Sequence, residues 1–252
     1  MILLAFIFLL ILAVISKVNL YKDGFEVQSK IPKIIMQTYI DRDKVPQKVF
    51  DNMKKYAPEY EYLFFNNEGC LRFLKEHFDQ TVLNAYNTLE HRAHKADLFR
   101  YCFLYKKGGV YMDIKTELIK PLSDIIKKNI MYTVLSINKN TIYQGIIATK
   151  PHNPFFLKLI KHCVSMSKKP NLPYRVFTSE FYIQIEKETG KAKPGYNKNL
   201  VHRGNDYYLF TEKCSKNAND CYDGLDRHGF CCFVWDGGEK IIKTRYADYP
   251  WK

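Results

Sequence analysis

Two carboxylates and one guanidinium between positions 97 and 113 are the densest group of residues that could do chemistry. Residues 91–113 read HRAHKADLFRYCFLYKKGGVYMD. Asp97 and Arg100 are three positions apart, which places them on one face of a helix. Most neighbouring residues are apolar, so this helix is expected to pack into a core. Its charges must then face a cleft or be paired, because burying a lone charge is costly. The structural alternative is a local surface ion pair, worth under ~1 kcal/mol.

A third charged residue, Asp113, is expected at the end of a strand. Gly108 and Gly109 stop the helix and allow a tight turn into an apolar strand over residues 110–114. Ligands of α/β proteins bind beyond the carboxyl ends of the strands. Asp113 is therefore a candidate ligand-binding carboxylate at the same site as the helix pair.

The elements that must position these residues follow from the apolar patterns. Short apolar runs predict strands over residues 33–37, 60–65, 110–114, 131–137 and 143–149. Helical patterns occupy residues 46–55, 70–77, 81–89, 91–107 and 154–165. This alternation predicts an α/β fold with a mainly parallel sheet and helices on both faces. The chain after residue 191 looks irregular, with short strand-like pieces at 230–235 and 240–244.

Composition narrows the class of protein. The chain has 252 residues, of which 46% are hydrophobic and 15% aromatic, too many for a disordered protein. Its 39 Lys and Arg against 26 Asp and Glu give a net charge of +13. Because the lysines are spread along the chain, they indicate a solvated surface, with attraction of phosphorylated substrates or anionic membrane as the second interpretation. Nucleic-acid binding is not expected, since it favours clustered basic residues.

The N-terminus carries a membrane-targeting signal. The first 15 residues, MILLAFIFLLILAVI, are all apolar. This run is shorter than the roughly 20 residues that cross a bilayer comfortably. We therefore expect a signal anchor, or a signal peptide cleaved after Ser16, over residues 1–20. A polar stem over residues 21–30 would then lead to one folded domain over residues 31–252.

Charge alone does not decide on which side of the membrane the folded domain lies. Lysines follow the apolar run and none precedes it, and the positive-inside rule would place the folded domain in the cytosol. The cysteines argue for a lumenal compartment. Four of the seven lie between positions 214 and 232, where two disulfides would hold a loop-rich segment. A zinc site is the rival, but the C-x2-C pairs are missing. Cys102 is expected to be a core thiol.

The strand IPKIIMQTY and the run H-x-x-H-K-A-D-L-x-R-Y…G-G-V-Y-M-D-I-K-T resemble glycosyltransferase family 32, which includes fungal Golgi α-1,6-mannosyltransferases and inositol-phosphoceramide mannosyltransferases. The resemblance covers residues 31–122, with weaker similarity over 144–159. It implies a GT-A type, Rossmann-like fold. It also implies transfer of a hexose, with retention of configuration, from a UDP- or GDP-sugar to a glycan or glycolipid. The family's single N-terminal anchor favours a Golgi or ER lumenal domain, with a cytosolic orientation as the alternative.

The resemblance also implies residue roles. Asp97, Arg100 and Asp113 would carry catalysis. The residues expected to bind the donor are Asp97, Arg100, Gly109, Tyr111, Asp113, Lys115 and Gln144. Asp113, the first acid of the D-x-D motif, would contact Mn²⁺ or Mg²⁺, which stabilises the charge developing on the leaving diphosphate. Weaker candidates for closing the site from the C-terminal part are His202, Arg203 and Trp251.

The sequence departs from the family pattern at two positions. Met36 stands where the family has His, and Lys115 replaces the second acid of D-x-D. Lys115 has three interpretations: a lost metal ligand, a positive charge that itself binds the diphosphate, or a side chain pointing away while Asp248 completes the metal shell. The lost acid also motivates an alternative function, a catalytically silent carbohydrate- or nucleotide-binding protein.

Overall fold

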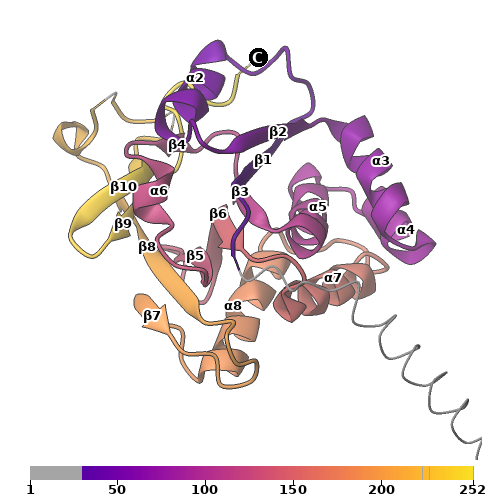
Figure 1. Cartoon of the computed structure of the whole chain (residues 1–252). Coiled ribbons are helices and arrows are strands. Elements are labelled where there is room, and N and C mark those ends of the chain that lie inside the picture. The colour runs from indigo at the N-terminus through magenta and orange to yellow at the C-terminus, as the bar shows by residue number, and fades with distance from the viewer. Residues whose placement is uncertain (1–29, 223, 227, 252) are drawn as a thin grey trace, which may run out of the picture.

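The computed structural model in Figure 1 describes residues 30–222, 224–226 and 228–251. The predicted membrane segment over residues 1–20, and all of the predicted stem except Lys30, lie outside these residues. Within the described part of the chain, no helix has both the length and the hydropathy needed to cross a bilayer.

Strands and helices alternate through the first two thirds of the described chain. The strands are β1 (Ile34–Thr38), β2 (Glu61–Phe65), β3 (Gly109–Met112), β4 (Glu117–Leu118), β5 (Met131–Leu135), β6 (Ile142–Thr149), β7 (Gly195–Asn197), β8 (Tyr207–Ser215), β9 (Cys231–Asp236) and β10 (Glu239–Lys243). The helices are α2 (Gln47–Tyr56), α3 (Asn67–His77), α4 (Gln80–Thr88), α5 (Arg92–Lys107), α6 (Leu122–Ile125), α7 (Pro154–Met166), α8 (Val176–Thr189) and the short 3₁₀ turn η1 (Ala218–Asp220).

The strands form one mixed sheet in the order β2-β1-β3-β6-β5-β8-β9-β10-β4, with β7 paired to β8. Only β1–β2, β1–β3 and β5–β8 pair in parallel among the described strands. The other pairings are antiparallel, so the predicted mainly parallel sheet is wrong. Short connections explain two of these pairings, because residues 136–141 between β5 and β6 and Gly237–Gly238 between β9 and β10 are too few for a parallel crossover.

Helices cover both faces of the sheet, as predicted. One core cluster contains buried side chains of α3, α4, α5, α7 and α8. A second cluster contains buried side chains of α2 and α6. Strand β3 shows the division, because Tyr111 packs in the first cluster and its neighbours Val110 and Met112 pack in the second. In Figure 1, α5, α7 and α8 lie together beside the sheet.

The C-terminal part is more regular than predicted. The strand-like pieces at 230–235 and 240–244 are found as β9 and β10. Strand β8, in a region predicted to be irregular, runs for nine residues and joins β5 to β9. Only the start of its sequence, YYLFTEKCS, is clearly apolar, so the pattern conceals the strand. The helix α8 was also not predicted, since aromatic and β-branched residues dilute its helical signal.

Two disulfides join this region, which confirms the prediction for the four clustered cysteines. Cys214 bonds to Cys232, which lies opposite it in the antiparallel pair of β8 and β9. The second bridge joins Cys221 to Cys231. The remaining cysteines, Cys70, Cys102 and Cys163, are buried free thiols. The prediction of a core thiol at position 102 is therefore confirmed.

Candidate active site

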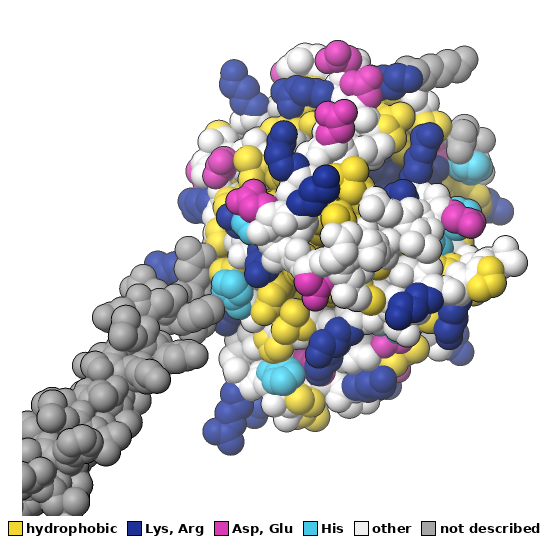
Figure 2. Space-filling model, turned by 90° about the vertical axis from the view of Figure 1, so that its right-hand side faces the viewer, with side chains coloured by type: hydrophobic (Ala, Val, Ile, Leu, Met, Phe, Trp, Pro, Cys, Tyr) yellow, Lys and Arg dark blue, Asp and Glu magenta, His cyan; other side chains and the backbone are white. Residues whose placement is uncertain are grey.

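A cleft of about 930 Å³ contains most of the predicted site residues. One side, called here the α5–β3 wall, comprises residues 92–115 where they line the cleft. A second set of lining residues, called the β8–β10 wall, comprises those between 212 and 249. On the face shown in Figure 2, Lys and Arg side chains are scattered among acids and do not form one patch.

On the α5–β3 wall, Asp97 and Arg100 form a buried pair. Their side chains are 8% and 7% exposed, and Arg100 Nη2 lies 3.3 Å from Asp97 Oδ1. The apolar face of α5 holds the pair inside the protein, with Leu98 and Phe99 completely buried. The interpretation as a local surface ion pair is therefore wrong.

Asp113 lies directly after β3 and faces the same guanidinium. Arg100 Nη2 is 3.6 Å from Asp113 Oδ1, an atom that also accepts a hydrogen bond from the Tyr111 hydroxyl. The Lys115 ammonium contacts the other carboxylate oxygen, Oδ2. The Asp113 backbone is fixed as well, because its carbonyl accepts a hydrogen bond from Gln37 Nε2 at 3.2 Å. The structure thus brings both predicted acids and Arg100 together.

Arg100 lies between the two acids and is itself held by hydrogen bonds to backbone carbonyls. Its Nε donates to Ala96 O at 3.2 Å and its Nη1 to Gln144 O at 2.8 Å. The guanidinium carbon lies 4.2 Å from the centre of the Tyr111 ring, in cation–π contact. Because Nη2 faces both Asp97 and Asp113, the guanidinium of Arg100 positions these two carboxylates.

Burial changes the proton affinities of the charged groups in this wall. It raises the pKa of Asp97 to about 6, although the positive charges of Arg100 and Lys115 oppose the rise. Burial, together with the positive charges of Arg100 and Arg245, lowers the pKa of Lys115 to about 7. The two walls meet at Lys115, because its backbone O accepts a hydrogen bond at 3.0 Å from the N of Tyr246, the residue after Arg245.

The remaining predicted donor-binding residues differ in their placement. Gln144 lines the cleft, and its Oε1 accepts a hydrogen bond from Tyr101 at 2.8 Å. Its Nε2 is buried without a hydrogen-bond partner among the described residues, so it is available to a ligand oxygen. Gly109 does not line the cleft. It has a φ of +88°, and a Cβ there would lie 2.7 Å from Ile34 O, so its role is the tight turn against β1.

The β8–β10 wall contributes charged residues that the sequence did not reveal. Glu212 Oε2 accepts hydrogen bonds from Ser136 Oγ at 2.9 Å and from Ile137 N at 3.2 Å. Arg245 Nη1 lies 3.3 Å from Asp226 Oδ2. No local motif marks these residues, and Glu212 lies on the strand that was not predicted.

Four C-terminal candidates do not line the cleft. Asp248 is paired on the surface with Lys48, whose Nζ lies 2.6 Å from its Oδ2, so it does not complete a shell around Asp113. His202 lies 4.0 Å from Glu188. Trp251 packs behind the rim, against residues that do line the cleft, Tyr39 and Tyr249. Arg203 is exposed away from the site.

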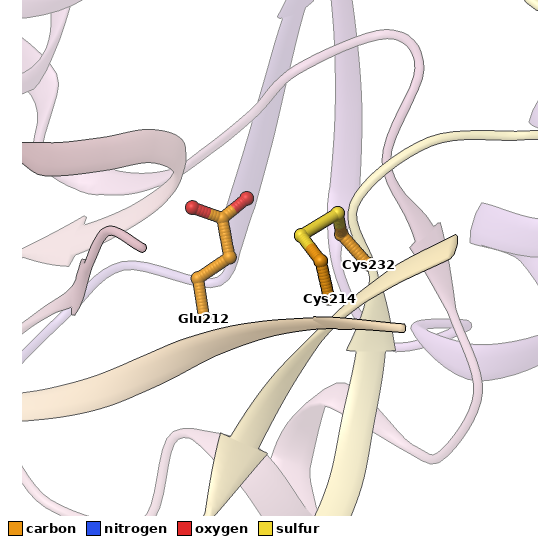
Figure 3. Close-up of side chains that lie close together, drawn as sticks. All are labelled: Glu212, Cys214 and Cys232. Carbon is orange, nitrogen blue, oxygen red and sulfur yellow. A yellow bond between two sulfur atoms is a disulfide. The ribbon is translucent and has the colours of Figure 1, made fainter. Parts of the chain in front are cut away.

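The residues around Asp113 do not fit a divalent cation. Both oxygens of its carboxylate are already contacted by Tyr111, Arg100 and Lys115. Within the described residues, the only cluster of three potential metal ligands is Glu212, Cys214 and Cys232. Figure 3 shows that the two sulfurs of that cluster are bonded to each other, so neither can offer a thiolate. The predicted metal contact of Asp113 therefore has no supporting ligand set here.

Part of the chain matches a known family in sequence. Residues 39–132, which contain the whole α5–β3 wall, match the family described as "Glycosyltransferase sugar-binding region containing DXD motif". These residues are somewhat more than a third of the chain.

Similar proteins are found in yeast and in a virus. The mannosyl phosphorylinositol ceramide synthase CSH1 of Saccharomyces cerevisiae is 28% identical over 88% of this chain and 63% of its own length. The uncharacterized glycosyltransferase L373 of Acanthamoeba polyphaga mimivirus is 28% identical over 76% of this chain and 80% of its own length. The initiation-specific alpha-1,6-mannosyltransferase of S. cerevisiae is 26% identical over 68% of this chain and 38% of its own length. This chain therefore spans well under half of that relative. Among solved structures, the PaToxG glycosyltransferase aligns with a TM-score of 0.48 and 16% identity over 64% of this chain and 70% of its own.

Proposed function

We propose that this chain is a retaining hexosyltransferase that moves a sugar from a UDP- or GDP-sugar to a glycan or glycolipid. Two of the relatives named above are mannose-transferring proteins by name, which supports mannose as the sugar. The family match supports a GT-A type, Rossmann-like arrangement of the sheet and helices.

The observation that carries this proposal is the buried group of Asp97, Arg100 and Asp113 in the wall of a large cleft. Burial of three charges is expensive, and here it is tolerated because each charge has a fixed partner. A carboxylate held in this way accepts hydrogen bonds from sugar hydroxyls without reorganising. Gln144, with an unpartnered Nε2 in the same wall, can donate one. These are the contacts that orient a sugar for transfer.

Transfer breaks the bond between the anomeric carbon and the diphosphate oxygen, so negative charge develops on the leaving diphosphate. The cleft must therefore supply positive charge at that end of the donor. In this role Asp97 holds the sugar, and Arg100 keeps Asp97 and Asp113 in position. A retaining reaction has no obligatory general base, and none is assigned.

For the compartment, we propose a membrane-anchored domain in the Golgi or ER lumen. The apolar N-terminal run supports the anchor, and the two disulfides support an oxidising compartment. Protease protection on intact vesicles tests this proposal. Digestion of the domain without detergent would contradict it and favour the cytosolic orientation.

The activity test uses the full-length chain in detergent, incubated with GDP-mannose, UDP-glucose or UDP-galactose and a glycolipid or oligosaccharide acceptor. Release of nucleoside diphosphate together with a glycosylated product is expected for one donor. Nucleotide binding with neither transfer nor donor hydrolysis would contradict the proposal. That outcome would instead establish the alternative, a catalytically silent binding protein.

A further inference from the structure

We propose that Lys115 and Arg245 together bind the donor diphosphate, and that this binding needs no divalent cation. The proposal deepens the function proposed above and rests on its nucleotide-sugar donor. The two residues come from different segments of the chain, and both line the cleft.

Lys115 occupies the place where a metal bound to Asp113 would lie. Its ammonium contacts Asp113 Oδ2 and lies 5.7 Å from the centre of the Tyr143 ring. Its backbone is fixed, because Lys115 O accepts a hydrogen bond from Tyr246 N at 3.0 Å. A divalent ion at Asp113 would have to displace this ammonium and would then lie beside Arg100. Both changes are unfavourable, since like charges repel strongly in a partly buried site.

Arg245 supplies a second cation from the β8–β10 wall. Its side chain is 31% exposed and pairs with the carboxylate of Asp226. The preceding residue, Thr244, donates hydrogen bonds to Cys232 O from its backbone N at 2.9 Å and from its Oγ1 at 3.2 Å. The disulfide-linked strand therefore fixes the backbone next to Arg245. A guanidinium presents several N–H groups in one plane, which suits two phosphate oxygens at once.

The charge of the whole lining agrees with an anionic ligand. Among the described residues, seven basic side chains line the cleft, namely Arg92, Lys95, Arg100, Lys115, Arg175, Lys243 and Arg245. Five acids line it, namely Glu90, Asp97, Asp113, Glu212 and Asp226. The lining therefore carries an excess of positive charge from the protein alone.

Equilibrium binding of UDP, GDP and inorganic pyrophosphate to the full-length chain tests the proposal without depending on turnover. The titrations are run in EDTA and again with millimolar Mn²⁺. We expect at least one nucleoside diphosphate to bind in EDTA with an affinity within about twofold of that in Mn²⁺. Lys115→Ala and Arg245→Ala should each weaken this binding about 10- to 100-fold in both buffers, because each removes a charge-assisted phosphate contact.

Two controls separate this effect from a general loss of charge or of fold. Arg72→Ala removes an exposed arginine of α3 that does not line the cleft, and it should leave the affinity unchanged. Lys115→Arg keeps the charge and should retain more affinity than Lys115→Ala. The proposal is overturned if none of the three probes binds in EDTA, or if both alanine variants bind like the wild type. Binding in EDTA without sugar transfer would uphold this proposal while refuting the proposed transferase activity.

Discussion

The two walls of the cleft are built in different ways. The α5–β3 wall comes from one continuous segment, in which a buried helix and the following strand bring Asp97, Arg100 and Asp113 together. The β8–β10 wall comes from separate strands and loops, joined by two disulfides, and contributes Glu212 and Arg245. Helix packing fixes the first wall, whereas covalent bridges and strand pairing fix the second. We infer a corresponding division of labour, in which the α5–β3 wall holds the sugar and both walls hold the diphosphate.

The largest effect is expected from Asp97→Asn. An amide accepts hydrogen bonds with one oxygen instead of two, and it carries no charge to pair with Arg100. Sugar transfer should fall by at least about 100-fold, comparable to the loss of one transition-state hydrogen bond in other enzymes. The unfolding curve should still show one cooperative transition. Asp124→Asn, an exposed acid of α6 outside the cleft, is the matched control. Transfer by Asp97→Asn at the wild-type rate would show that the pair is only structural.

Lys115→Asp converts the α5–β3 wall to the usual family pattern. It removes the ammonium and places a second carboxylate beside Asp113. In EDTA, transfer should fall about 10- to 100-fold, since a charge-assisted phosphate contact is lost. Addition of Mn²⁺ should restore part of the activity to this variant and leave the wild type unchanged. Unaltered transfer in both buffers would mean that Lys115 does not act on the donor.

Removing a disulfide should weaken the β8–β10 wall selectively. The double variant Cys214→Ser/Cys232→Ser opens a loop with a sequence separation of 18, and the free energy of unfolding should fall by about 3 kcal/mol. Nucleotide affinity should fall as well, because the Cys232 carbonyl fixes the backbone next to Arg245. The Cys221→Ser/Cys231→Ser variant, with a separation of 10, should lose less stability. Denaturant titration gives the stabilities. An equal loss of stability in both variants would contradict this expectation.

The smallest expected effect is on pH dependence. Asp97 must be ionised to pair with Arg100 and to accept two hydrogen bonds, and burial raises its pKa to about 6. Below that pH the carboxyl is protonated, so kcat/KM should fall about tenfold for each unit of decrease. Above about pH 7 it should fall again, because Lys115, whose pKa is lowered to about 7, loses the charge that binds the diphosphate. A profile that stays flat down to pH 5 would show that the charge on Asp97 is not needed.

The difference between the two walls also explains which parts of the site the sequence could predict. In the α5–β3 wall, the group of Asp97, Arg100 and Asp113 was predicted from the sequence, because helical spacing, a Gly–Gly turn and a strand end are local signals. Gly109 was misjudged as a donor contact, since the same glycine signal also marks a turn packed closely against Ile34. Glu212 and Arg245 were missed because long-range strand pairing brings them to the cleft, and β8 has only a short apolar run. The mixed sheet was missed because the strand pattern does not reveal direction.

The division of labour between the walls is tested most directly by comparing two dissociation constants in three proteins. One is for the nucleotide-sugar that the chain turns over, and the other is for the corresponding nucleoside diphosphate. Both are measured in EDTA for the wild type, Asp97→Asn and Arg245→Ala. We predict that Asp97→Asn weakens binding of the nucleotide-sugar about tenfold more than binding of the nucleotide, because only the former presents sugar hydroxyls. Arg245→Ala should weaken both by the same factor. Equal weakening of both ligands by Asp97→Asn, or no weakening of either by Arg245→Ala, would contradict the account.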